Sequence, residues 1–241
     1  MGCCGDARRS RILSRRRAAV SRSKEGGVQD VQSGRRFLTQ RPDDALRVLL
    51  ARGYLQPPDR PAERLDDQLR PGVELELDGS GKAEIETGMP FFNHMLESFT
   101  RHGFFDIRIK AKGDIEVDYH HTVEDVGLAL GQAFKEALGD KQGIRRFGEA
   151  SCPLDEALAQ VVVDLSGRPY IYYNVKIRPG RVGEFDTDLP HEFFAAFANQ
   201  LGMNLHIDVP RGENPHHIIE ACFKAFARAL DCATQIDPRV E

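Results

Sequence analysis

The chain has 241 residues, 41% of them hydrophobic, which suffices for one sizeable core or two small halves packed together. Acidic and basic residues nearly balance, and no run approaches the roughly 18 to 20 apolar residues of a membrane-spanning helix. The start lacks the apolar segment of a secretory signal and the five cysteines are scattered, so we expect a soluble protein of a reducing compartment with no membrane partner.

The beginning of the chain differs in charge from the rest. Residues 1–70 contain 16 Lys and Arg against 9 Asp and Glu, and Phe37 is their first aromatic residue. Without interleaved aromatics this stretch favours a solvated tail over a nucleic-acid-binding segment. Residues 1–71 are therefore predicted to be a basic N-terminal extension that is either disordered or foreign to the domain that follows. Residues 1–36 also resemble a transit peptide, which would place the protein in a plastid instead of the cytoplasm that we expect.

Periodic structure begins at residue 72. Alternating apolar residues at Val73, Leu75 and Leu77 predict a strand, and a turn at residues 78–81 leads to a returning strand near 83–85. A short amphipathic helix over about 93–101, a strand at 107–109 and a longer helix over 120–138 follow. Residues 72–142 are thus predicted to form one β-β-α-β-α half.

The same order of elements recurs in residues 143–235. Strands are predicted near 158–164 and 170–175, a helix near 192–200, a strand at 205–207 and a helix from His216 onward. The segments "MPFFNHMLESFTRHG" and "HHTVED" match "LPHEFFAAFANQLG" and "HHIIEA" in composition and order. Residues 72–241 are therefore expected to be one domain of the α/β (α+β) class, built by tandem duplication.

The repeated motif HHxxE is the main chemical signal. It occurs as His120-His121 with Glu124 and as His216-His217 with Glu220. Residues i and i+4 share a helix face, so the first histidine and the glutamate of each motif can bind one ion, and imidazole with carboxylate suits Mn, Fe or Zn. A single HHxxE is ordinary at a solvated helix start, but two copies at matching places favour metal.

The second histidine of each motif projects about 100° away from the first, so it should reach a different ion. The economical arrangement has two pseudo-symmetric metal sites, each with a His-Glu pair from one repeat and His121 or His217 from the other. His94 is a natural fourth ligand in the first short helix. Counting back from the glycine after each short helix, Glu192 matches His94 better than His191 does, by one residue.

Three basic residues suggest a phosphate site. They are Arg146 in "GIRRFG", Arg168 in "SGRP" and Lys224 in "FKAFARAL". Arg forks match phosphate oxygens and Lys supplies a point charge, although a surface basic residue is the ordinary interpretation of each one alone.

These residues lie in strings that resemble the imidazoleglycerol-phosphate dehydratase family over roughly residues 72–230. The strings "FFNHML", "HHTVEDVGLALG", "RRFG", "LDEALA", "DLSGRP" and "HHIIEACFKAFARAL" stand in the family's order and spacing. The resemblance implies two similar halves whose helices lie between two sheets, and a homo-oligomer of 24 subunits with sites between subunits.

The resemblance also implies the site residues. It assigns one Mn²⁺ to His94, His121, His216 and Glu220, and a second Mn²⁺ to His120, Glu124, Glu192 and His217. All of these ligands except Glu192 are also expected to be catalytic residues. It places the phosphate of a phosphorylated imidazole substrate at His102, Arg146, Arg168 and Lys224.

The implied reaction removes water from D-erythro-imidazoleglycerol phosphate to give imidazole acetol phosphate, in histidine biosynthesis. Two Lewis acids on the ring nitrogens would stabilise an imidazolate that expels the neighbouring hydroxyl through a diazafulvene. Loss of the adjacent carbon's proton then gives an enol, which becomes the ketone.

Three departures from the family pattern stand out. Members usually carry "TKET" before the first strand, whose glutamate is a candidate acid/base, whereas this chain has Gln68 at the aligned position, in "LDDQLRPG". Ser98 and Cys222, carried over as substrate-binding positions, replace a glutamine and a serine. Two alternatives therefore remain, a catalytically impaired metal-bound shell and a dinuclear metallohydrolase.

Overall fold

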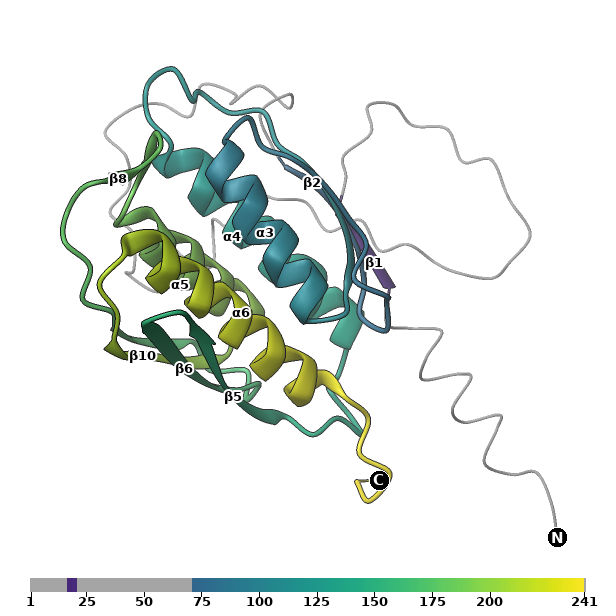
Figure 1. The fold of residues 1–241 in the computed structure, drawn as a ribbon. Helices are drawn as coiled ribbons and strands as arrows, with labels where there is room; N and C mark the ends of the chain where they lie inside the picture. The colour runs from purple at the N-terminus through teal and green to yellow at the C-terminus, as the bar shows by residue number, and fades with distance from the viewer. Residues whose placement is uncertain (1–16, 21–70, 241) are drawn as a thin grey trace, which may run out of the picture. The chain divides into compact units, whose positions relative to one another are not determined.

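The computed structural model describes residues 17–20 and 71–240, all within one compact unit (Figure 1). Gln68 and most of the predicted N-terminal extension lie outside the described residues. In chain order the elements are β1 (Arg17–Val20), β2 (Gly72–Glu76), β3 (Ala83–Glu86), α3 (Pro90–His102), β4 (Asp106–Lys110), α4 (His120–Leu138), β5 (Phe147–Leu154), β6 (Ala157–Asp164), β7 (Tyr170–Asn174), β8 (Arg181–Val182), β9 (Phe185–Asp186), α5 (Leu189–Leu201), β10 (Asn204–Arg211) and α6 (Pro215–Thr234).

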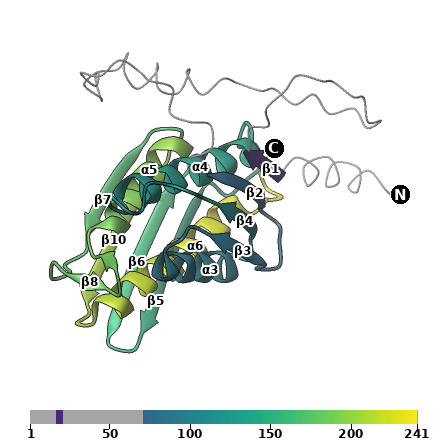
Figure 2. The same ribbon diagram turned by 90° about the horizontal axis from the view of Figure 1, so that it is seen from above.

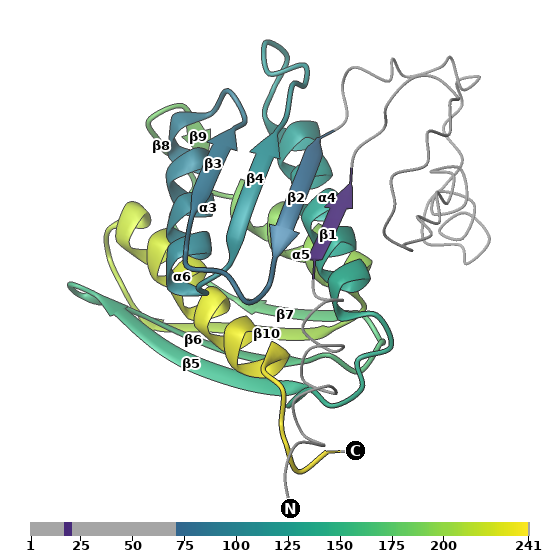
Figure 3. The ribbon, with the colours of Figure 1, turned by 90° about the vertical axis from the view of Figure 1, so that its right-hand side faces the viewer.

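Two four-stranded sheets enclose the helices. The first sheet has the order β1-β2-β4-β3 and the second β5-β6-β10-β7. Helices α3 and α4 pack on the first sheet, α5 and α6 on the second, and the two helix pairs pack on each other (Figures 2 and 3). The predicted fold class, a duplicated half with its helices between two sheets, is confirmed.

The duplication extends to the pairing of the strands. In the first sheet β4 pairs antiparallel with β2 and parallel with β3, and in the second β10 pairs antiparallel with β6 and parallel with β7. Val73 opposite Ile109 corresponds to Val161 opposite Ile207. Each half is therefore built on the same hydrogen-bonded frame.

Each four-stranded sheet contains one strand more than predicted. β1 pairs antiparallel with β2, and β5 pairs antiparallel with β6 in the matching place. The expectation of disorder throughout residues 1–71 is wrong at Arg17–Val20, because this strand occupies the edge of β2, which would otherwise present unpaired N–H and C=O groups. The sequence did not predict β5, because Gly148 and Pro153 interrupt its alternation of apolar and polar residues. The short β8–β9 hairpin was also unpredicted.

The amphipathic pattern determines which side chains face inward. Val73, Leu75 and Ile107 are buried against the helices, while Arg108, on the outer face of the first sheet, pairs with Glu84 through its Nε at 2.6 Å. The centre is rich in phenylalanine, including the fully buried Phe92, Phe99, Phe105, Phe134, Phe193, Phe194, Phe197, Phe223 and Phe226. Aromatic packing between the helix pairs fixes how they face each other.

The helices begin where their sequences allow. α4 has the predicted bounds, whereas α3 and α5 each start three residues earlier than expected. Pro90 and Pro190 account for this, since proline is favoured in the first helical turn, where no N–H partner is needed. Among the described residues no helix is both long enough and apolar enough to cross a bilayer.

Candidate metal centre and active site

The metal-type side chains that meet in this chain come from α3 and α6. His94 lies in the first turns of α3, and His216 and Glu220 lie one turn apart at the start of α6. Asn214 caps α6, its side-chain oxygen accepting a hydrogen bond from the backbone N–H of His216 at 2.9 Å. This cap sets where the helix begins, and the four-residue spacing puts His216 and Glu220 on the same face.

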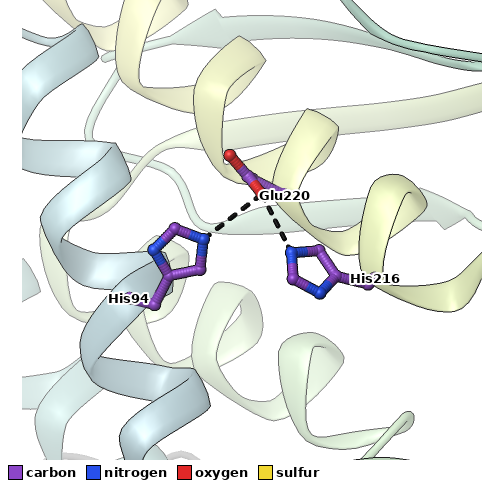
Figure 4. Close-up of side chains that lie close together, drawn as sticks. All are labelled: His94, His216 and Glu220. Carbon is purple, nitrogen blue, oxygen red and sulfur yellow. Dashed lines mark hydrogen bonds and ion pairs between the residues drawn. The ribbon is translucent and has the colours of Figure 1, made fainter.

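A three-residue cluster results (Figure 4). Oε2 of Glu220 lies 3.3 Å from Nε2 of His94 and 3.1 Å from Nε2 of His216. The candidate ligand atoms all lie within 4.8 Å of one another, the only group of three such residues to do so in the part of the chain that the structure describes. Two imidazole nitrogens and a carboxylate oxygen form a donor set that suits a divalent transition metal.

Glu220 is held in its charged form. Burial alone would raise the pKa of this carboxyl, but the hydrogen bond and charge of Lys224, followed by the contact with His216, outweigh burial and lower it. Nζ of Lys224 lies 2.7 Å from Oε1 of Glu220, and both side chains are more than 80% buried. One carboxylate oxygen therefore faces the histidines and the other faces a cation.

A pocket of about 330 Å³ lies beside His102, and its lining includes Ser151 on β5 and Arg228 on α6. Desolvation, with the positive charges of Lys224 and Arg228, lowers the pKa of His102, so its ring is predominantly neutral near pH 7. The charges of Lys224 and Glu220 both act on His102, so this predicted phosphate-binding residue at the end of α3 lies in the electrostatic neighbourhood of Lys224. Lys224 itself is one turn from Glu220 on α6.

The remaining predicted ligands lie outside this cluster. His217 contacts Glu156 on the turn between β5 and β6, with its Nδ1 2.8 Å from Oε2. His121 lies 3.5 Å from Asp114, and Glu192 lies 3.1 Å from its neighbour His191. The rings of His120 and His121 touch edge to face at the start of α4, which also carries Glu124. A single chain therefore assembles three of the eight predicted ligands.

The two predicted arginines lie at one end of the second sheet. Arg146 makes a bidentate pair with Asp164, at 2.7 and 3.1 Å, and its guanidinium lies 4.9 Å from the centre of the Phe147 ring. Arg168 lies just before β7, and its carbonyl oxygen accepts a hydrogen bond from Asn204 at 2.6 Å. No contact within the described chain joins either arginine to Lys224.

Cys222 and Ser98, the two other residues expected to bind substrate, both lie in the core of this chain. Cys222 is 1% exposed in the core, and burial raises the pKa of its thiol to about 12, so it packs as a small apolar residue. Ser98 is also buried, and its hydroxyl has no hydrogen-bond partner among the described residues. Both positions are on the inward faces of α3 and α6, which sequence comparison with a family pattern does not reveal.

Sequence reasoning missed three residues that contact or adjoin the predicted ones. Asp114 precedes α4 and meets His121, while Glu156 meets His217. Arg228 could have been found, because it lies four residues after Lys224 on the same face of α6. Glu156 belongs to the string "LDEALA", but only the fold brings that turn to the start of α6.

Comparison with known proteins places this chain in a family. Residues 87–230 match the family model described as imidazoleglycerol-phosphate dehydratase. A protein of that name from Geobacter metallireducens is 57% identical over 179 residues, covering 74% of this chain and 92% of the relative. Another, from Shouchella clausii, is 60% identical over 169 residues, covering 70% and 87%.

Solved structures agree with the sequence matches. Imidazoleglycerol-phosphate dehydratase from Staphylococcus aureus has a TM-score of 0.65 at 43% identity, over 69% of this chain and 95% of that one. The Pyrococcus furiosus enzyme in complex with (S)-C348 has a TM-score of 0.63 at 37% identity, over 76% and 96%. With its duplicated fold and its His-Glu cluster, the chain belongs to the imidazoleglycerol-phosphate dehydratase family of hydro-lyases.

Proposed function

We propose that this chain dehydrates D-erythro-imidazoleglycerol phosphate to imidazole acetol phosphate using two divalent metal ions, with Mn²⁺ as the metal. Membership of the dehydratase family supports the reaction. The observation that carries the proposal is the cluster of His94, His216 and Glu220 with Lys224 one turn further along α6. A metal-type donor set and a phosphate-type cation on adjacent helical turns suit a substrate that bears both an imidazole and a phosphate.

The ligand sets follow the pattern of the two repeats. We assign His94, His121, His216 and Glu220 to one ion and His120, Glu124, Glu192 and His217 to the other. The donor chemistry fits, since both sets combine neutral imidazoles with carboxylate, which Mn²⁺ accepts. When bound, the ions supply Lewis acidity to the substrate's ring nitrogens.

The protein's own groups prepare this site. Lys224 keeps Glu220 ionised and thus able to act as a ligand near neutral pH. The neutral ring of His102 and the ammonium of Lys224 offer hydrogen-bond donors for phosphate oxygens. Arg146 and Arg168 would complete the phosphate site, with Asp164 holding the guanidinium of Arg146 in one orientation.

We further propose a homo-oligomer, with 24 subunits as the expected number, whose sites lie between copies. One chain gathers three of the eight ligands, and Arg146 and Arg168 lie on a different element of the fold from Lys224. The outer face of the second sheet supports association, because it exposes Val162, Tyr170 and Tyr172, whereas the outer face of the first sheet carries paired charges.

The deciding experiment is a turnover assay of the full chain with imidazoleglycerol phosphate in the presence of Mn²⁺. We expect imidazole acetol phosphate as product, and loss of most turnover in His216→Asn, while Glu86→Gln on the first sheet keeps wild-type rates. Metal binding and assembly without turnover would favour the impaired shell. Release of inorganic phosphate instead of dehydration would favour the metallohydrolase.

We also propose a cytoplasmic location. The described cysteines, Cys152, Cys222 and Cys232, are free thiols, as is usual in reducing compartments. A fluorescent fusion of the full chain should fill the cytoplasm, whereas import into plastids that depends on residues 1–36 would identify a transit peptide.

A further inference from the structure

Glu156 lies in the two-residue turn that joins β5 to β6, and its two carboxylate oxygens contact different groups. Oε1 accepts hydrogen bonds from the backbone N–H groups of Glu213 and Asn214, at 3.1 and 2.8 Å, immediately before α6. Oε2 lies 2.8 Å from Nδ1 of His217 in the first turn of α6. Three groups from one short segment therefore converge on a single side chain.

The contact with His217 determines which ring nitrogen carries the proton. A carboxylate can only accept hydrogen bonds, so Nδ1 of His217 must be the donor. A neutral imidazole that is protonated at Nδ1 has its free lone pair at Nε2. Nε2 is the nitrogen on the opposite side of the ring, 3.8 Å from Asp155 and away from Glu156.

We propose that Glu156 is a positioning residue that orients His217 and fixes its Nδ1–H tautomer, so that Nε2 is presented to a metal ion. The proposal rests on the assignment of His217 as a metal ligand under the proposed function. Carboxylates that hold the second nitrogen of a ligating histidine commonly strengthen metal binding, and losing one weakens it about 10- to 100-fold.

Glu156→Gln separates this role from a purely structural one. The glutamine oxygen can still accept from Glu213 and Asn214, so the turn stays tied to α6. Its NH₂ group would then face Nδ1 and donate to it, which moves the ring proton to Nε2 and blocks the ligand position. A structural tie alone predicts no change in metal affinity, whereas a positioning role predicts a loss.

The experiment is a titration of the full chain with Mn²⁺ alone. Electron paramagnetic resonance measures the concentration of free Mn²⁺ at each step. The hydrogen bond to Glu156 raises the pKa of His217, so removing the Glu156 charge would by itself leave more of the ring neutral and able to bind metal. A loss of metal affinity in the variant therefore cannot come from protonation. We expect Glu156→Gln to bind one of two ions about 10- to 100-fold more weakly than wild type, with an unchanged melting temperature. Glu86→Gln, the same substitution on the opposite sheet, should bind as wild type. Unchanged affinity in Glu156→Gln would overturn the proposal.

A second measurement does not depend on the variant. In metal-free wild-type protein with ¹⁵N-labelled histidine, the His217 resonances, identified by their loss in His217→Asn, should show a protonated Nδ1. A proton on Nε2 would overturn the proposal even if Glu156→Gln fails to fold. Both measurements omit the substrate, so a chain that binds Mn²⁺ but performs no dehydration would refute the proposed function and leave this test valid.

Discussion

Nζ of Lys224 lies 2.7 Å from Oε1 of Glu220, four residues earlier in α6. The same carboxylate turns its other oxygen toward His94 and His216. A candidate phosphate-binding cation and a candidate metal ligand are therefore linked by one ion pair, largely shielded from water. This arrangement can couple the binding of a phosphate to the geometry of the ligand set.

Replacing Lys224 by Ala should raise KM for imidazoleglycerol phosphate more than it lowers kcat. A phosphate contact of equal strength in the ground and transition states contributes only to KM. A charged hydrogen bond is worth about 1.5 to 3 kcal/mol, which corresponds to about 10- to 150-fold in KM. Steady-state kinetics with Lys224→Arg as the charge-retaining control would test this. A fall in kcat at constant KM would instead assign Lys224 to the chemical step.

Removal of metal should dissociate the oligomer into smaller species. One chain gathers only His94, His216 and Glu220, so the other proposed ligands must be supplied across contacts between copies, and binding stabilises the assembly that presents them. Sedimentation velocity before and after thorough chelation should show smaller species, and added Mn²⁺ should restore the large one. A sedimentation coefficient that stays constant through chelation would contradict shared ligands.

Substitution of Gly148 by Ala should destabilise the fold. Gly148 lies on β5 where α6 crosses it, and an added Cβ would overlap the backbone carbonyl of Ala229. Overpacking of this kind typically costs about 1 to 3 kcal/mol. Gly72→Ala is the matched control, since nothing lies within 4 Å of the Cβ it would gain. Urea midpoints should fall for Gly148→Ala and stay near wild type for Gly72→Ala; equal midpoints would contradict the close packing.

Asp106 should make stability depend on pH in the acid range. Burial alone would raise its pKa, but hydrogen bonds from the backbone N–H groups of Lys82 and Ser80 outweigh burial and lower the pKa below the ordinary value of 3.8. The charged form is thus favoured by folding, so its contribution is present above about pH 4 and is lost as the pH falls through the folded pKa.

Asp106→Asn tests whether the charge of Asp106 stabilises the fold above about pH 4. The variant should be less stable than wild type at pH 7, and the difference in unfolding free energy should narrow as the pH is lowered below about 4. Denaturant unfolding across this range measures the difference directly. A difference in unfolding free energy that stays the same at every pH would show that the charge of Asp106 does not contribute to stability.

Glu25 is a second candidate for the acid/base carboxylate that the family pattern places at Gln68. β1 pairs with β2 as β5 pairs with β6, with Val20 in the place of Ala150. Counting along the chain, Glu25 follows Val20 by five residues, as Asp155 follows Ala150. We therefore expect Glu25→Gln to lower dehydratase turnover by about 10² to 10⁴, the usual worth of acid–base help.

The matched variant is Gln68→Glu, which should leave turnover near wild type. Both variants should be compared at equal metal loading, so that a change in occupancy is not mistaken for a change in chemistry. A large gain in Gln68→Glu, with no effect of Glu25→Gln, would instead show that the missing acid/base carboxylate belongs at position 68.

The sequence by itself determined the duplicated order of strands and helices and the two HHxxE motifs, because apolar periodicity and i,i+4 spacing are local properties of the chain. The bounds of α4 follow from such local signals, as does the pairing of His216 with Glu220. Only the tertiary structure placed β1 and β5 at the sheet edges, brought His94 from α3 to Glu220, and set Glu156 against His217. It also showed that Cys222 faces the core. The two side-chain contacts join residues 61 and 126 positions apart, where packing decides which residues meet and no local sequence pattern reports it.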